Sequence, residues 1–176
     1  MTDILQRDSP ILRGKAKPVP VHEIGSSHIR KIVADMIEAM RVQKDGVAIA
    51  APQIGEPLRI FAVSGSLLGK ADRRYKGDGS DLVFFNPRIV KLSKEKHEVE
   101  EGCLSVRWLY GKVRRSVRAT IEAYNEHGEK VERGASGLLA QIFQHECDHL
   151  DGVLFTDKSA EIWEMTEEEI RELQGK

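Results

Sequence analysis

The clearest hydrophobic pattern in the chain is helical and covers residues 26–45. Its apolar residues recur at the intervals of one helical face: Ile29, Ile32, Val33, Met36, Ile37 and Met40. Ser26 or Ser27 can cap the start of this segment, and Asp45-Gly46 can end it. We therefore expect a core helix. The preceding residues, 1–25, carry three prolines and predict an extended arm with turns.

Shorter patterns in the middle of the chain indicate β-strands. Residues 58–63 and 82–85 are apolar runs of strand length, and Asn86-Pro87 is expected to end the second run. Residues 117–124 alternate as a half-buried strand does, and a turn at 125–128 precedes a further short strand. Residues 64–81 are rich in glycine and charge, which predicts a solvated, mobile loop.

Two more helices are expected in the last third of the chain. Residues 137–152 are bracketed by glycines and largely apolar between them, and Thr166 with Glu169 has the spacing of a capping box in an acidic tail. Strands clustered in mid-chain with helices towards both ends indicate an α+β fold. The 176 residues suit one domain, 1–176, with a core of its own.

Composition narrows the classes of function. Lys and Arg number 27 and Asp and Glu number 28, so the net charge of −1 provides no bulk attraction to nucleic acid or to a membrane surface. The sequence contains no apolar run of membrane-spanning length, and its first twenty residues lack the apolar stretch of a signal peptide. We expect a cytoplasmic protein, in which its two cysteines are more often buried, metal-binding or catalytic than paired.

Residues 145–149 read HECDH, an HExxH sequence inside an apolar helical run. Residues four apart share a helix face, so His145 and His149 can bind one metal ion, with Glu146 close to a water on that ion. Cys147 points away from this face and is expected to pack in the core.

A catalytic site of this kind usually takes a third protein ligand. Cys103 is the best candidate, because a thiolate is a strong ligand for a soft or borderline ion. A lone cysteine is also often a small buried residue, and the tail offers Glu161 and Glu164 as other candidates.

Three segments together resemble, in order and spacing, the signature motifs of peptide deformylases. They are GVAIAAPQ at 46–53, EGCLS at 101–105 and QHECDHL at 144–150, and the opening segment ILQRDSPILRGKAKPV is similar as well. This family removes the formyl group from the N-formylmethionine of newly made polypeptides. The resemblance implies antiparallel strands packed around a central helix that carries the HExxH.

The resemblance also implies roles for individual residues. The metal ligands it implies are Cys103, His145 and His149. They would hold one divalent ion per chain, commonly Fe²⁺, which Zn²⁺ or Ni²⁺ can replace. Glu146 would be the general base and acid, and Gln53 with the backbone N–H of Leu104 would stabilise the oxyanion. Members usually act as monomers.

Residues around this site are candidates for binding the formylated peptide. The glycine-bracketed segment at 46–51 suggests an exposed edge that a peptide could join as an extra strand. Gly46, Val47 and Ala48 would then contact the substrate, with Gly102 facing them. Side chains that could line the methionine pocket or the groove, or could equally be ordinary core, are Leu138, Val99, Trp108 and Tyr110.

The chain departs from the family pattern in three places. Ala48 stands where the second glycine of G-x-G-x-A-A-x-Q is usual, and Arg107-Trp108 stands where many members have Pro-Gly. We therefore expect a rim of different shape around the site. Some members dock on the ribosome through a basic C-terminal helix. Because the short tail of this chain is acidic, we do not infer ribosome docking from the resemblance.

Three alternatives remain open from the sequence. A metallopeptidase using the same helix would cleave internal peptide bonds without needing Cys103, and a structural metal site would be closed by a fourth protein ligand. The third is a family member that binds formylated peptides but turns them over slowly because of Ala48. Glu146 and Gln53 argue against the structural site, because neither is needed merely to hold a metal. The sequence also predicts a partner for Glu101 among Arg114, Arg115 and Arg118, without choosing between them.

Overall fold

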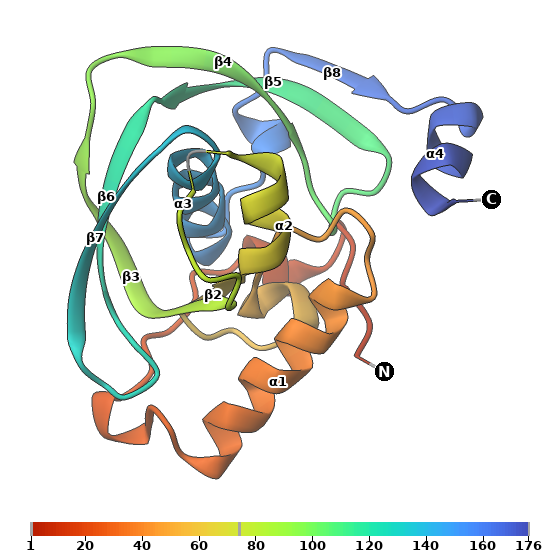
Figure 1. The fold of residues 1–176 in the computed structure, drawn as a ribbon. Coiled ribbons are helices and arrows are strands. Elements are labelled where there is room, and N and C mark those ends of the chain that lie inside the picture. The colour runs from red at the N-terminus through yellow and green to blue at the C-terminus, as the bar shows by residue number, and fades with distance from the viewer. Residues whose placement is uncertain (1, 74, 176) are drawn as a thin grey trace.

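The structure is a computed structural model that describes residues 2–73 and 75–175, and helix α3 contacts both of its antiparallel sheets (Figure 1). The helices are α1 (Ser27–Arg41), α2 (Gly65–Ala71), α3 (Gly137–Leu150) and α4 (Glu167–Gln174). The strands are β1 (Ala48–Ala50), β2 (Ile60–Val63), β3 (Leu82–Leu92), β4 (Lys96–Gly102), β5 (Leu109–Ser116), β6 (Arg118–Tyr124), β7 (Lys130–Ser136) and β8 (Glu161–Glu164). This arrangement confirms the α+β prediction.

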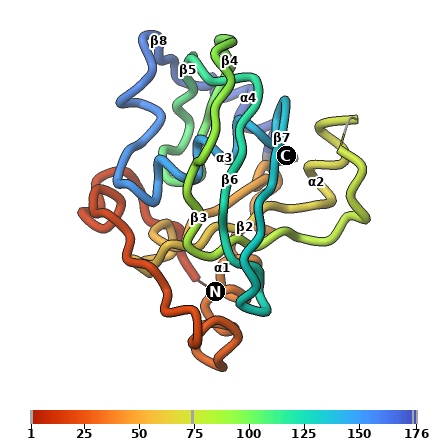
Figure 2. Tube along the Cα trace, turned by 90° about the vertical axis from the view of Figure 1, so that its left-hand side faces the viewer, coloured from red at the N-terminus to blue at the C-terminus, as the bar shows by residue number. Residues whose placement is uncertain are grey.

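The chain passes from one sheet to the other between β3 and β4 and returns between β5 and β6. The five-stranded sheet has the order β1-β2-β3-β6-β7, and the three-stranded sheet has the order β4-β5-β8. Figure 2 shows both sheets and the N-terminal arm, which runs along one side of the molecule. Strands β1 and β4 are therefore edge strands of different sheets, and both lead into the functional site described below.

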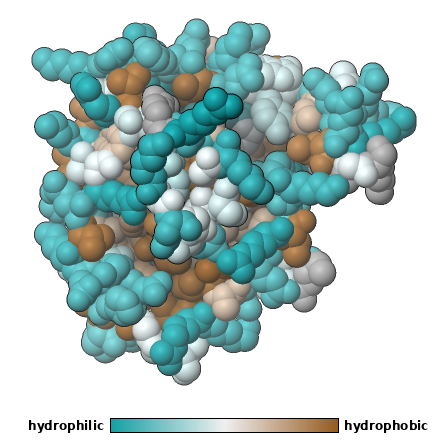
Figure 3. All heavy atoms as spheres, viewed as in Figure 1, coloured by the Kyte–Doolittle hydropathy of each residue, from teal (hydrophilic) through white to brown (hydrophobic). Residues whose placement is uncertain are grey.

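The core consists of three apolar clusters. The largest packs α3 against the five-stranded sheet and contains the rings of Phe61, Phe84 and Phe143, whose centroids lie 5.0–6.1 Å apart. A second cluster packs α1 against β1 and β2, and a third lies beneath β5 around Phe155. Polar residues cover most of the face shown in Figure 3, and apolar residues appear between them in small groups.

The capped helices form where the sequence predicts them. Ser26 Oγ accepts a hydrogen bond from the Ile29 N–H (3.3 Å) at the start of α1, and Thr166 and Glu169 form the capping box of α4. Residues 2–25 make an arm with two short 3₁₀ turns, Pro10–Arg13 and Val21–Glu23. Among the described residues, no helix is long and apolar enough to cross a membrane.

The prediction that Asn86-Pro87 ends a strand is wrong, because β3 continues to Leu92. Asn86 has a φ of 51° and lies at a shift in the register between β3 and β6. Its amide group bonds both the N–H and the carbonyl of Val19 (2.7 Å each), as a neighbouring strand would. The bulge accommodates Pro87, and the polar part of β3 then pairs with β6.

The prediction of a loop over residues 64–81 is wrong for its first part, which forms α2. Ser64 Oγ accepts from the Leu67 N–H (3.4 Å), and Leu68 is fully buried against the main core. Helix α2 has only seven residues, two of them glycines, so the sequence shows no helical periodicity there. A helix this short is stabilised mainly by tertiary packing, here of Leu68.

Candidate metal centre

Helix α3 brings His145 and His149 together on one face. It follows β7 directly, and Gly137 at the junction has a φ of 60°, which permits the sharp turn into the helix. The two imidazole centroids are 4.9 Å apart, as expected for positions four residues apart on a helix. His149 is 1% exposed and His145 is half-buried at the wall of a cleft.

Cys103 lies in the turn after β4 and points at the two histidines. Its Sγ is 3.1 Å from His149 Nε2, and one donor atom from each of Cys103, His145 and His149 lies within 4.8 Å of the others. Within the described ranges this group contains no fourth His, Cys, Asp or Glu, and Glu161 and Glu164 of β8 are not part of it. Two imidazoles and one thiolate suit a borderline divalent ion that keeps an open position.

Cys103 and His145 shift each other's pKa towards the ionised forms. Burial alone would raise the pKa of Cys103, but the adjacent His149 and His145 lower it to about 5. Burial alone would lower the pKa of His145, whereas Cys103 and Glu101 raise it well above the usual value. A thiolate beside two imidazoles is the donor set that a divalent cation can take up by displacing protons.

A buried ion pair fixes the orientation of His145. His145 Nδ1 donates to Glu101 Oε2 (2.9 Å), which leaves Nε2 for the metal group. Arg115 donates to both oxygens of Glu101 (2.7 and 2.8 Å) and to Asp148 (2.6 Å), whose other oxygen accepts from Lys158. Arg115 is thus the arginine that pairs with Glu101. Burial raises the pKa of Glu101. The contacts with Arg115 and His145 lower it by more, so the pKa falls to about 2.

Glu146 is buried beside the metal group without a full set of partners. Its side chain is 3% exposed, and its Oε2 has no hydrogen-bond partner among the described residues. Burial raises the pKa of this carboxyl group. A buried carboxylate with a free oxygen is costly unless a bound group completes its surroundings, so this atom supports the fit of a metal and its water.

Gln53 and Leu104 lie on the other side of Cys103. The Gln53 Oε1 accepts from the Ala50 N–H (2.8 Å), and its Nε2 donates to Ser105 Oγ (3.1 Å) at 3.6 Å from Cys103 Sγ. The Leu104 N–H has no acceptor in the described part of the chain. The structure therefore brings both proposed oxyanion donors next to the metal group. Ser105 is a partner that sequence reasoning missed.

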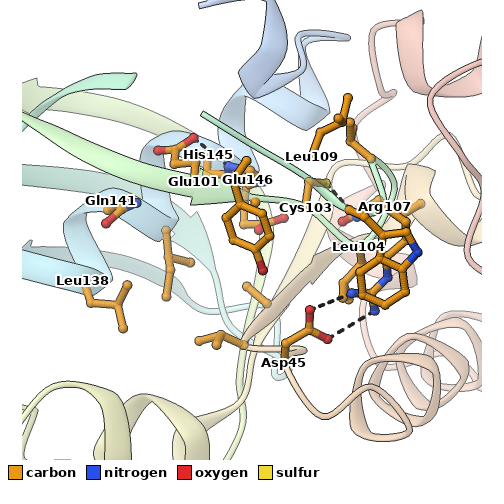
Figure 4. A pocket seen from close by; sticks show the side chains of 18 residues that line it. Asp45, Glu101, Cys103, Leu104, Arg107, Leu109, Leu138, Gln141, His145 and Glu146 are labelled. Atoms are coloured by element: carbon orange, nitrogen blue, oxygen red, sulfur yellow. Dashed lines mark hydrogen bonds and ion pairs between the residues drawn. The ribbon is translucent and has the colours of Figure 1, made fainter. Parts of the chain in front are cut away.

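A cleft of about 180 Å³ opens onto this centre (Figure 4). Val47, Ala48, Gly102 and Leu138 all line it, as do Cys103, His145 and Glu146, whereas His149 and Val99 do not. The lining also excludes Gly46, where an added Cβ would lie 2.4 Å from the Met40 carbonyl oxygen, so this glycine permits close packing against the end of α1.

The rim of the cleft carries a second ion pair that sequence reasoning missed. Arg107 donates to both oxygens of Asp45 (2.6 and 3.2 Å) and to Gln43 (2.7 Å), and Figure 4 shows the contact with Asp45. Its guanidinium group lies 5.0 Å from the ring centroid of Trp108. This pair joins the segments before β1 and after β4. Cys147, in contrast, is buried in the main core, and burial raises its pKa to about 12.

The fold and the centre together define a class of protein. A Cys-His-His group with an open position, beside a buried glutamate and a cleft, is the arrangement of a mononuclear metal-dependent hydrolase. The polypeptide deformylase family model matches residues 1–164. The chain belongs to the peptide deformylase family, hydrolases that remove the N-formyl group from newly made polypeptides.

Similar proteins agree with this assignment. The chain is 41% identical to peptide deformylase 2 of Clostridium acetobutylicum over 85% of this chain and 89% of that protein. It is 43% identical to the peptide deformylase of Fusobacterium nucleatum over 84% and 78%. Among solved structures, the enzyme from Thermotoga maritima has a TM-score of 0.78 at 34% identity, covering 92% of this chain and 99% of that one. A Met-Ala-Ser complex of the Acinetobacter baumannii enzyme has a TM-score of 0.76 at 33% identity, with coverage of 89% and 98%.

Proposed function

We propose that Cys103, His145 and His149 bind one divalent ion, Fe²⁺ in the native enzyme, with Zn²⁺ or Ni²⁺ able to replace it. The observation that carries this assignment is the convergence of the three donor atoms within 4.8 Å. The thiolate favours a soft or borderline metal over Mg²⁺ or Ca²⁺. When bound, such an ion lowers the pKa of a bound water and polarises a carbonyl oxygen.

Glu146 is the general base and acid in this proposal. Its free Oε2 accepts the proton of the water that attacks the formyl carbon and later donates a proton to the leaving amine, giving formate and a free N-terminus. The raised pKa of the buried carboxyl group suits a residue that must both accept and donate a proton. Arg115 and Glu101 keep His145 oriented while the charge in the site changes.

Gln53 and Leu104 stabilise the negative charge that develops on the formyl oxygen. The Gln53 amide is oriented by Ala50, and the Leu104 N–H, which has no acceptor among the described residues, is available as a second donor to that oxygen. Preorganised donors of this kind act in the transition state without having to reorganise.

The substrate in this proposal is an N-formylmethionyl peptide or nascent chain that lies in the cleft. The edge strand β1 with Val47 and Ala48, and Gly102 at the end of the edge strand β4, offer backbone groups to an extended peptide. Leu138 and Ile142 of α3 offer an apolar wall for the methionine side chain. The Met-Ala-Ser peptide bound by the Acinetobacter baumannii relative supports this use of the cleft.

We further propose that the enzyme is a single domain that acts as a monomer in the cytoplasm on newly made chains. Helix α4 begins with three glutamates, Glu167, Glu168 and Glu169, and their negative charge disfavours contact with RNA phosphates. The proposal therefore includes no docking on the ribosome through this helix and no direct binding of nucleic acid.

The test is formate release from formyl-Met-Ala-Ser by protein purified without oxygen and loaded with Fe²⁺. We expect release by the wild type, no release by Glu146→Ala, and one metal per chain in both. Loss of the bound metal on Cys103→Ser would support the ligand assignment. Cleavage of casein without formate release would instead indicate a metallopeptidase and contradict the proposal.

A further inference from the structure

Two aromatic side chains lie on the cleft beyond the catalytic group. Trp108 and Tyr110 both line the cavity that contains Cys103 and Glu146, and both are half-buried. Trp108 follows β4 at the point where this chain departs from the Pro-Gly of many deformylases, and Tyr110 is in β5. The proposed chemistry uses neither ring, so their presence in the cleft calls for an explanation.

Trp108 is held from several directions. It has a φ of 62°, a conformation that costs a non-glycine residue energy and persists only when the surroundings impose it. Its carbonyl accepts from the Met165 N–H (2.8 Å), and the Arg107 guanidinium lies over its ring. Asp45 and Gln43 fix Arg107 in turn. The indole is thus a rigid part of the cleft and not a freely rotating surface side chain.

Tyr110 is fixed by its neighbours in the sheet. It pairs with Gly102 of β4 on one side and with Trp163 of β8 on the other. A Cβ added to Gly102 would lie 2.7 Å from the Tyr110 ring, so the ring covers the glycine directly. The pKa of the Tyr110 phenol is raised, first by burial and second by the negative charge of Asp45. Tyr110 therefore reaches from β5 over Gly102 towards the opposite wall.

We propose that Trp108 and Tyr110 form an aromatic subsite for the residues that follow formylmethionine in the substrate. The inference rests on the proposed use of the cleft and adds a preference to it, for aromatic or large apolar side chains at the second or third position. Rigid rings bind such side chains with little loss of conformational freedom. The charges of Asp45 and Arg107 neutralise each other, so contact with the rings decides the preference.

The test compares the kcat/KM values of formyl-Met-Ala-Ser, formyl-Met-Phe-Ser and formyl-Met-Ala-Phe with the metal-loaded enzyme. We expect at least one phenylalanine peptide to exceed the first by roughly 2- to 10-fold, the range of one aromatic contact. The gain is expected in KM, with kcat changed less than about twofold, because the subsite binds substrate and transition state alike.

Two substitutions remove the rings with little damage to the fold. Trp108→Gly suits the positive φ and restores the residue common in the family, and Tyr110→Ala removes the second ring. Each is expected to reduce the preference, whereas the matched variant Tyr110→Phe keeps the ring and keeps the preference. Equal kcat/KM values for all three peptides in the wild type, or an unchanged preference in both ring-deleting variants, would overturn the subsite.

Binding of the product peptides Met-Phe-Ser, Met-Ala-Phe and Met-Ala-Ser, followed by calorimetry, tests the same preference without turnover. A chain that binds a phenylalanine product more tightly but releases no formate would retain the subsite while contradicting the proposed catalysis. A chain that releases formate but binds all three products equally would retain the catalysis and overturn the subsite.

Discussion

Replacing Arg115 with alanine is expected to destabilise the metal-free protein by about 3–5 kcal/mol, the usual cost of removing one partner from a buried ion pair. Arg115 is 5% exposed and donates to both oxygens of Glu101, which is 4% exposed. Without the guanidinium, the buried Glu101 carboxylate keeps only His145 as a partner among the described residues. The lost contact with Asp148 adds less, because that carboxylate is partly exposed and also binds Lys158.

The assay is equilibrium unfolding in urea at neutral pH with a chelator present, followed by circular dichroism. For a chain of this length, the loss corresponds to a fall in Tm of roughly 6–20 °C. Arg114→Ala is the matched control, because this neighbouring arginine is exposed on the same strand and should change stability by less than about 0.5 kcal/mol. Adding Glu101→Gln to Arg115→Ala should recover part of the loss, since no buried charge then remains unpaired.

The pH dependence gives a second check on the same reasoning. A folded-state pKa of about 2 for Glu101 means that its pairing contributes stability above the unfolded pKa and loses it as the pH falls towards 2. The difference between wild type and Arg115→Ala should therefore shrink below about pH 4. A loss below about 1 kcal/mol at neutral pH, or a difference independent of pH, would refute the buried-charge argument.

Four further predictions concern the catalytic centre. Glu146→Gln should lower kcat by roughly 10²–10⁴ while the metal stays bound, which formate release and metal analysis check. The metal-free variant should be no less stable than the wild type in urea unfolding, because the buried Oε2 of Glu146 has no partner among the described residues. Gln53→Ala should lower kcat by about 10²–10³ with a smaller effect on KM, measured by formate release. Saturation with metal to 100 times its Kd should stabilise the wild type by about 2.7 kcal/mol, and Cys103→Ser should lose most of this gain in a melting experiment. Iodoacetamide should alkylate Cys103 and spare Cys147 in the folded metal-free protein, and the rate of alkylation should fall as the pH drops below about 5. Peptide mapping identifies the labelled cysteine, and label on Cys147 would contradict the prediction.

Features that depend on short-range spacing could be predicted from the sequence. The two histidines are four residues apart on one helix, and their contact follows from helix geometry. The convergence of Cys103 on them spans 46 residues to His149, and only donor chemistry and the family resemblance indicated it. The capping residues Ser26 and Thr166 also act locally, and both helices begin where expected.

Features that depend on tertiary contacts could not be predicted. Arg107 and Asp45 are 62 residues apart, and nothing in the sequence around a charged residue indicates which distant residue it will pair with. The choice of Arg115 over its neighbours depends on which face of β5 meets α3. Asn86 ends a strand by ordinary turn rules, yet its contacts with Val19 replace the missing backbone bonds and let β3 continue.

Strand β1 is three residues long and lies at the edge of its sheet. A substrate added at this edge must present its own first residues in an extended form, because each N–H and C=O group that pairs with the enzyme cannot also pair within the substrate. An N-terminus that has already wound into a helix keeps its first N–H groups free, but its carbonyls are paired within the helix and its backbone is not extended. If the substrate binds at this edge as proposed, the formyl group must be removed while the end of the chain is still extended and unfolded.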